Sequence, residues 1–248
     1  MTLGPLGTRT LLAEDPMHRA LLRIVRHAAE TGTPLPNEYD LATRLGCGRQ
    51  QVRNALSALE TAGVIRRRQG AATTVDPMGL QMSVRLEDQF EHTELLARLG
   101  YEASVEILET EIAPLPARVA ALLEVERDAP AVRTRKRWSA DGRPVMLADG
   151  YLLVPDREER VLPDSVFSAA SALWGEPIIW DVTTPGAVAL DAERAGLLEM
   201  PEGAAVLTLE LVGVAASGRR LFHALEHHDP SVVQYSLVRS VRPPWGIV

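Results

Sequence analysis

A cluster of hydrogen-bond donors stands at the start of one amphipathic segment in the N-terminal third of the chain. The segment runs from about residue 48 to residue 62 and places apolar side chains at helical spacing. Its first turns carry Arg49, Gln50, Gln51, Arg53 and Asn54. In the major groove of DNA, arginine can donate two hydrogen bonds to guanine, and glutamine can pair similarly with adenine. The residue types and their spacing therefore predict the base-reading end of a DNA-binding helix.

Two further helices are predicted before this segment, and they would hold it in place. Residues 17–30 repeat apolar side chains at helical spacing, and residues 37–45 do the same behind Asn37, a good N-cap. Gly46 is expected to end the second helix, because glycine readily adopts the left-handed backbone conformation. A short turn between the second and third helices is the arrangement of a helix-turn-helix, whose second helix enters the major groove.

A basic hairpin is predicted directly after the third helix. Gly63 would end that helix, and residues 64–65 and 73–75 have the composition of two short strands. Such a wing can contact the DNA backbone or the minor groove. Its candidate DNA contacts are Arg66, Arg68, Gln69 and Gly70. We therefore predict a winged helix-turn-helix over residues 16–76, preceded by an N-terminal arm at 1–15.

Charge is distributed unevenly along the 248 residues, whose formal net charge is -7. Residues 17–76 contain nine arginines and five acidic residues, whereas the chain from residue 77 onward has sixteen basic and twenty-six acidic residues. A basic module joined to an acidic body is typical of a chain in which one part meets a polyanion. A winged helix that binds protein is the alternative, but the arginines and glutamines of the third helix favour DNA.

The composition narrows the class of protein. The single cysteine, Cys47, excludes an intrachain disulfide and a cysteine-based zinc site. The chain contains neither a run of about 18 apolar residues nor the layout of a signal peptide, so we expect a cytoplasmic protein with no membrane partner. Its length accommodates two domains.

The larger C-terminal part contains an internal repeat. The segment from Leu122 to Arg143 is echoed by the segment from Leu197 to Arg219, at an offset of 75 and then 76 residues. Each copy reads as a short helix, a strand, a glycine turn and a return strand. Two related halves around one mostly antiparallel sheet with flanking helices are therefore expected, which makes the fold class α+β. We place a linker at 77–85, this domain at 86–242 and a tail at 243–248.

The N-terminal pattern resembles the GntR family of winged-helix regulators. The matching positions are Leu35-Pro36, Glu38, Leu41-Ala42, Leu45-Gly46, Arg49, Val52-Arg53, Ala55-Leu56, Leu59-Glu60, Gly63, Ile65 and Arg68-Gln69-Gly70. The resemblance implies that Arg49, Gln50, Gln51 and Arg53 contact bases and phosphates, and that Gln69 and Gly70 form the wing tip. The chain departs from the family pattern at Tyr39, Gly48 and Ala72. The resemblance implies that Tyr39 replaces an arginine that contacts phosphate, and loss of such a contact would weaken DNA binding largely independently of sequence.

The region from about 86 to 242 resembles the UTRA ligand-sensing domain of the HutC-like branch of that family, which shares its fold with chorismate lyase. The clearest motif is Asp141-Gly142-x-Pro144-Val145, followed by Tyr151-Leu152. The resemblance implies a homodimeric repressor of metabolic or transfer genes that binds a palindromic double-stranded operator and responds to a small-molecule effector. The related enzyme fold suggests catalysis as the alternative, but the sequence has no nucleophile paired with a base, so we expect no catalytic residues and no cofactor.

Three arginines indicate where an effector could bind. Arg133, Arg135 and Arg137 alternate along one predicted strand, so their side chains should share one face. An anionic effector would pair with them, and an ion-paired strand face is the alternative that stays open. The resemblance places Arg135 and Arg137 near the acidic or phosphorylated effectors of such sensors, with Glu226 and Tyr235 at the ligand's polar end. Gln89-Phe90 stands where sugar-phosphate sensors often have Ser-Phe.

Histidines near the end of the domain raise the possibility of a metal site. His223 and His227 would share a strand face, with His228 and Asp229 following. Four residues along a strand span roughly 13 Å, which is too far for two ligands of one ion. We therefore expect no metal site.

Overall fold

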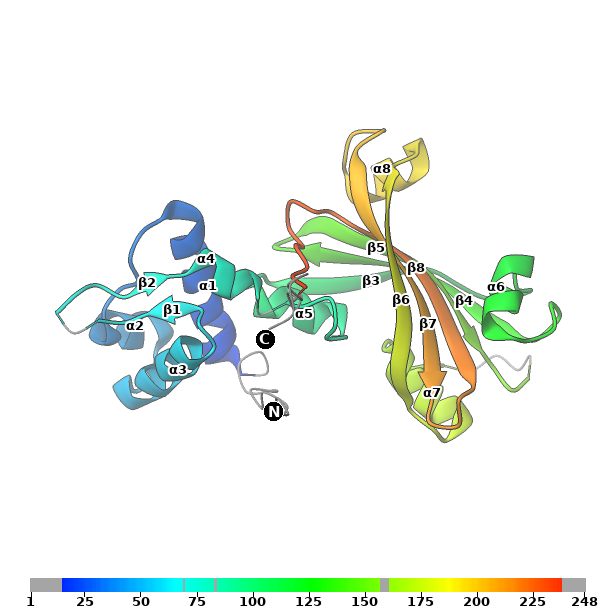
Figure 1. Ribbon diagram of the computed structural model, residues 1–248, viewed down its shortest axis with the longest axis horizontal. Helices are drawn as coiled ribbons and strands as arrows, with labels where there is room; N and C mark the ends of the chain where they lie inside the picture. Colours follow the sequence, from blue (N-terminus) through cyan, green and yellow to red (C-terminus); the bar gives the residue numbers. More distant parts are fainter. Residues whose placement is uncertain (1–14, 69, 83, 157–160, 238–248) are drawn as a thin grey trace, which may run out of the picture. The chain divides into compact units, whose positions relative to one another are not determined.

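The computed structural model describes residues 15–68, 70–82, 84–156 and 161–237 (Figure 1). These described residues divide into two compact units, one formed by those up to residue 102 together with 234–237, and the other by those between residues 103 and 233. Within the described ranges, no helix is both long and apolar enough to cross a membrane.

The first unit contains the predicted winged helix-turn-helix. Helices α1 (Pro16–Thr31), α2 (Glu38–Leu45) and α3 (Arg49–Thr61) precede an antiparallel pair of strands, β1 (Ile65–Arg66) and β2 (Thr74–Val75) (Figure 1). We call this part, residues 16–76, the head. Its core consists of apolar side chains from all three helices and the hairpin, including Leu21, Val25, Leu41, Leu56, Leu59 and Ile65.

Local hydrogen bonds define the ends of the head helices. The Asn37 side chain accepts a hydrogen bond from the Asp40 amide at 2.9 Å, as an N-cap does. Gly46 ends α2 with a φ of 62°, in the left-handed region. Gly48 has no side chain to cap α3, so the Gln51 side chain supplies the local bond by accepting from the Gly48 amide at 2.9 Å.

Two short helices extend the first unit beyond the predicted winged helix. They are α4 (Pro77–Gln81) and α5 (His92–Arg98), and α5 packs on α1. The Arg26 guanidinium lies 3.9 Å from the centroid of the Tyr101 ring, a cation–π contact that ties the end of this segment to α1. We assigned residues 86–102 to the larger domain from sequence, whereas the structure groups them with the head.

The second unit is built on one antiparallel sheet, six-stranded over the described residues, in the order β3-β4-β5-β8-β7-β6. The strands are β3 (Ala103–Ala113), β4 (Ala131–Ala140), β5 (Arg143–Leu153), β6 (Ile178–Ala189), β7 (Ala205–Ala215) and β8 (Arg220–His228). This confirms the predicted α+β fold with a mostly antiparallel sheet.

The strand order also shows the internal repeat as two halves that meet at the central strands β5 and β8. Helix α6 (Ala117–Leu123) belongs to the first half but packs on β8, and α8 (Ala192–Leu198) belongs to the second half but packs on β5. The correspondence extends to the backbone, because Glu124 and Glu199 end the two helices with φ values of 57° and 54°. Each half therefore covers the central strand of the other.

Strand alternation decides which helices share a face of the sheet. On β5, Leu147 packs in the cluster with α8 and Leu153 in the cluster with α6, so these helices cover the same face. Leu152 points the other way and packs with helix α7 (Val166–Trp174). We call these the α6/α8 face and the α7 face.

Candidate DNA-binding and effector sites

The predicted recognition residues are exposed at the start of α3. Arg49, Gln50, Gln51 and Arg53 are all solvent-accessible, while Val52 between them is fully buried. Gln50 donates a hydrogen bond to Asn54 one turn later, at 2.8 Å. The helix thus turns its apolar side to the core and presents donors on its outer side, as base reading requires.

Arg53 is held by an acidic partner on the preceding helix. Its Nη2 donates to Glu38 Oε2 at 2.8 Å, and its Nε donates to the same oxygen at 3.2 Å. These hydrogen bonds from Arg53 lower the pKa of the Glu38 carboxyl. Glu38 also lies 3.8 Å from Arg67, which in turn pairs with Glu60 at 3.0 Å. Sequence reasoning missed these partners because the contacts join separate elements.

The wing carries its basic residues in different environments. Arg66 forms an ion pair with Asp76, and the hydrogen bond from Arg66 lowers the pKa of that carboxyl. Arg68 is exposed, and Gly70 has a φ of 75°, a conformation that favours glycine. Gln69 lies outside the described residues. DNA contact by these wing residues stays a prediction.

The three arginines of β4 lie on one face, as predicted. Arg135 is paired in register with Asp149 and Arg137 with Leu147, which places the side chains on the α6/α8 face. Each guanidinium has a carboxylate partner, Glu111 for Arg133 at 2.9 Å, Asp149 for Arg135 at 2.7 Å and Glu106 for Arg137 at 2.6 Å. This is the ion-paired alternative left open by the sequence, and effector binding by these arginines stays a prediction.

Glu226 and Tyr235 do not join the arginines on that face. Glu226 is paired in register with Ala148, so its side chain lies on the α7 face, where its carboxylate is buried 3.0 Å from His228 Nε2. Tyr235 belongs to the first unit. The five predicted effector residues are therefore not a single cluster within the sheet unit.

Alternation along β8 also separates the histidines. His223 and His227 lie on the α6/α8 face and His228 on the α7 face. Burial lowers the pKa of His227. His223 Nε2 lies 3.0 Å from Glu210 Oε1, and Arg118 of α6 pairs with the same carboxylate.

Glu210 should make the stability of the sheet unit depend on pH in the acid range. Hydrogen bonds from Arg118 and from His223 lower the pKa of Glu210 from 4.5 to about 2. A carboxyl whose pKa falls on folding contributes stability that is complete above pH 4.5 and is lost as the pH falls toward 2. We expect Glu210→Gln to lower the melting temperature at pH 6 by more than at pH 3, as measured by calorimetry. Equal losses at the two pH values would contradict this linkage.

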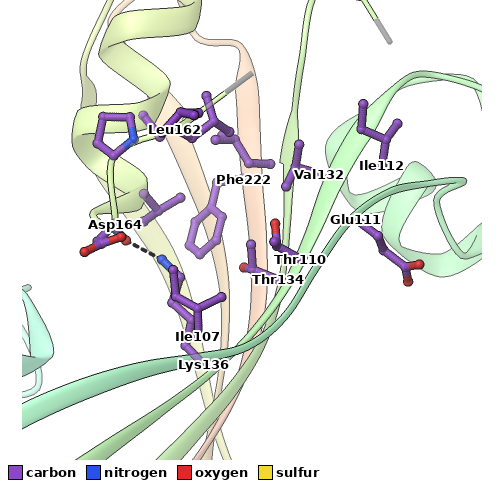
Figure 2. Close-up of a pocket in the computed structure, with 15 residues that line it drawn as sticks. Ile107, Thr110, Glu111, Ile112, Val132, Thr134, Lys136, Leu162, Asp164 and Phe222 are labelled. Atoms are coloured by element: carbon purple, nitrogen blue, oxygen red, sulfur yellow. Dashed lines mark hydrogen bonds between the residues drawn. The ribbon is translucent and has the colours of Figure 1, made fainter. Parts of the chain in front are cut away.

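A cavity of about 820 Å³ opens on the α7 face of the sheet (Figure 2). Strands β3, β4, β5 and β8 and helix α7 contribute its walls. Val132, Thr134 and Lys136 of β4 line it, so they alternate with the arginines of the opposite face. Sequence reasoning concentrated on the arginines and passed over this set, although the same period-2 pattern identifies it. The volume lies in the usual range of small-molecule sites.

The head and the sheet unit with its cavity together define a class of protein. A winged helix with exposed donors, followed by a domain able to hold a small molecule, is the organisation of a one-component transcriptional regulator. Residues 20–75 match the family of bacterial regulatory proteins called gntR, and residues 98–233 match the UTRA domain. The chain belongs to the GntR family, in the group that carries a UTRA domain, as its sequence motifs indicated.

Individual relatives agree with this assignment. The chain is 26% identical over 223 residues to the HTH-type transcriptional regulator Rv0792c of Mycobacterium tuberculosis, covering 87% of this chain and 81% of that protein. It is 28% identical over 189 residues to the uncharacterized HTH-type transcriptional regulator RB1450 of Rhizobium meliloti, covering 75% and 77%. Its fold resembles the crystal structure of PhnF from Mycobacterium smegmatis, with a TM-score of 0.55 and 20% identity over 88% of this chain and all of that one. The Mycobacterium tuberculosis and Rhizobium meliloti relatives are both named transcriptional regulators.

Proposed function

We propose that this regulator is a repressor that binds a palindromic double-stranded DNA operator and is relieved by a small-molecule effector. The observation that carries the proposal is the exposed row of Arg49, Gln50, Gln51 and Arg53 on the outer side of α3. Regulation of metabolic or transfer genes, action in the bacterial cytoplasm and the absence of any cofactor besides the effector are parts of the same proposal.

A homodimer would present two heads to the two halves of a palindrome. The edge strand β6 supports a self-association surface, because Ile179, Trp180 and Val182 are each more than half exposed, at 56%, 52% and 53%. Large apolar side chains gathered on one strand of a monomer commonly mark a protein interface. Light scattering on the purified protein should therefore give twice the chain mass of 27.0 kDa.

Effector control requires that the ligand binds more tightly to the state with lower DNA affinity. We propose that the effector changes the spacing of the two heads, so that they no longer fit both half-sites. An anionic effector would be consistent with the family resemblance, and either the arginine row of β4 or the pocket on the α7 face could supply a cation.

The test is an electrophoretic shift of the purified protein on DNA upstream of its own gene, at two salt concentrations and with scrambled competitor. A repressor should retain its operator specifically and lose affinity as salt rises, because phosphate contacts release counterions. If scrambled DNA abolishes the retention, the binding is not specific for an operator and the proposal is overturned. If nothing is retained at low salt, the proposal is also overturned, and a winged helix that binds protein is favoured.

A further inference from the structure

Glu38 lies where three parts of the head meet. It occupies the first turn of α2, and its carboxylate accepts hydrogen bonds from Nη2 and Nε of Arg53 on α3, at 2.8 and 3.2 Å. Arg67, which directly follows β1, lies 3.8 Å from the other carboxylate oxygen. The side chain of Glu38 is 26% exposed and that of Arg53 is 50% exposed, so the carboxylate is the more enclosed partner. Glu38 thus links α3 to the helix before it and to the wing.

Arg53 shares the outer side of α3 with the predicted base-reading residues. It stands four residues after Arg49, and side chains at this spacing are neighbours on one side of a helix. The hydrogen bonds from Arg53 to Glu38 use Nε and Nη2, which leaves Nη1 able to donate to another acceptor. Bidentate pairing with a carboxylate holds the flat guanidinium in one orientation. The direction in which Nη1 donates is therefore set by Glu38.

The charge of Glu38 acts against a general attraction to DNA. Hydrogen bonds from Arg53 lower the pKa of the Glu38 carboxyl, so this group is negative at neutral pH. A carboxylate among the arginines of a DNA-binding surface repels the phosphates that every DNA sequence carries. Glu38 also occupies Arg53, which could otherwise turn to any phosphate within its reach. Such a residue lowers the affinity for random DNA while it preserves a contact that one sequence offers in a defined place.

We propose that Glu38 is a positioning residue for operator specificity. It fixes Arg53 so that Nη1 meets one acceptor of the operator, and it keeps the same guanidinium away from the phosphates of random DNA. The inference rests on the proposed function, because it requires that α3 reads an operator. It assigns part of the discrimination between DNA sequences to an acidic residue of α2 that acts through an arginine of α3.

Glu38→Gln tests the inference, because glutamine keeps the size of the side chain and removes its charge. Fluorescence anisotropy of the full chain is measured with two labelled duplexes, the upstream fragment that the electrophoretic shift retains and a scrambled duplex of equal length. The variant should bind the scrambled duplex about threefold more tightly than the parent protein does, and the upstream fragment no more tightly. The ratio of the two affinities should therefore fall by about threefold to tenfold.

The salt dependence of binding is a second readout, which a merely structural role of Glu38 would not change. In Glu38→Gln, the released Arg53 can pair with a phosphate of the scrambled duplex and displace one more counterion. The slope of log affinity against log salt concentration on that duplex should become steeper by about 0.9. Calorimetry should show little change in the melting temperature, because the ion pair is partly exposed.

Glu60→Gln is the matched control for the loss of a negative charge. Glu60 is an exposed carboxylate of the same head, and it pairs with Arg67 at 3.0 Å. Its replacement should change the affinity for both duplexes alike and leave their ratio unchanged. A double variant provides the second control. In the Arg53→Ala background, Glu38→Gln should no longer lower the ratio, because no guanidinium remains to be positioned.

An unchanged affinity ratio or an unchanged salt slope in Glu38→Gln would overturn the inference. An equal fall of the ratio in Glu60→Gln, or in the Arg53→Ala background, would overturn it as well. Failure of the proposed function gives a different result, because the parent protein itself would then bind the upstream fragment no better than scrambled DNA. Specific binding by the parent with an unchanged ratio in Glu38→Gln rejects the role of Glu38 alone.

Discussion

Replacement of Arg49 by alanine should lower the affinity for the operator about 10- to 100-fold, the cost of losing one bidentate arginine contact to a base. Arg49 is exposed in the first turn of α3, next to the buried Val52 that fixes the orientation of the helix. Because its side chain contributes nothing to the core of the head, the melting temperature should be unchanged. Fluorescence anisotropy with a labelled operator fragment measures the affinity, and calorimetry checks the fold.

Arg127→Ala is the matched control, since it removes an exposed arginine from the sheet unit. It should bind the operator as the parent protein does. Arg53→Ala is a less specific probe, because it also deprives Glu38 of its bidentate partner in the head. Unchanged operator affinity of Arg49→Ala would show that α3 does not read the bases with its first turn.

Gly79→Ala should destabilise the head. We expect a larger loss of stability than for alanine at the other glycines whose φ is not positive. A Cβ at this position of α4 would lie 2.0 Å from the carbonyl oxygen of Gly63 and 3.0 Å from the Cα of Val64. These are backbone atoms at the end of α3 and the start of the wing, so no side chain can rotate away. Overpacking of this kind costs about 1–3 kcal/mol. Calorimetry should show the head melting roughly 5–15 °C lower.

Gly196→Ala is the control for this effect. Gly196 lies within α8 without a positive φ, and no atom lies within 4 Å of the point where its Cβ would stand. Alanine there should be neutral or should stabilise the protein by roughly 0.5–1 kcal/mol, because glycine is the poorer helix former. If both variants melt like the parent protein, the close approach of α4 to Gly63 does not constrain the fold.

Local signals explain why much of the fold could be predicted from the sequence. Asn37 and Gly46 bracket α2 as cap residues, and both positions carry the expected conformation in the structure. The repeat was visible because two copies of one helix, strand and turn pattern preserve the same spacing, which the strand order then confirms. These features depend on residues close together in sequence, where residue type and backbone conformation are directly linked.

Contacts between distant segments could not be predicted in the same way. The packing of α5 on α1 depends on a close approach at Gly100, where a Cβ would lie 2.5 Å from the Leu22 carbonyl oxygen. Likewise, no local sequence pattern predicts that Arg135 forms an ion pair with Asp149, or that Arg133 forms one with Glu111. The alternation of side chains along β4 predicts which of them share a face of the sheet. It does not predict which face carries the cavity, because that depends on how α7 packs.

The crossed placement of α6 and α8 has a consequence for how the sheet unit is assembled. Each helix shields the central strand contributed by the other half, so residues 103–153 alone would leave β5 without α8 and α6 without β8. A chain severed between the halves would expose apolar surface on both fragments. Complementation of the two fragments in trans, or exchange of helices between two identical fragments, would be the ways to cover it. The duplicated halves are therefore interlocked and should unfold in a single cooperative transition.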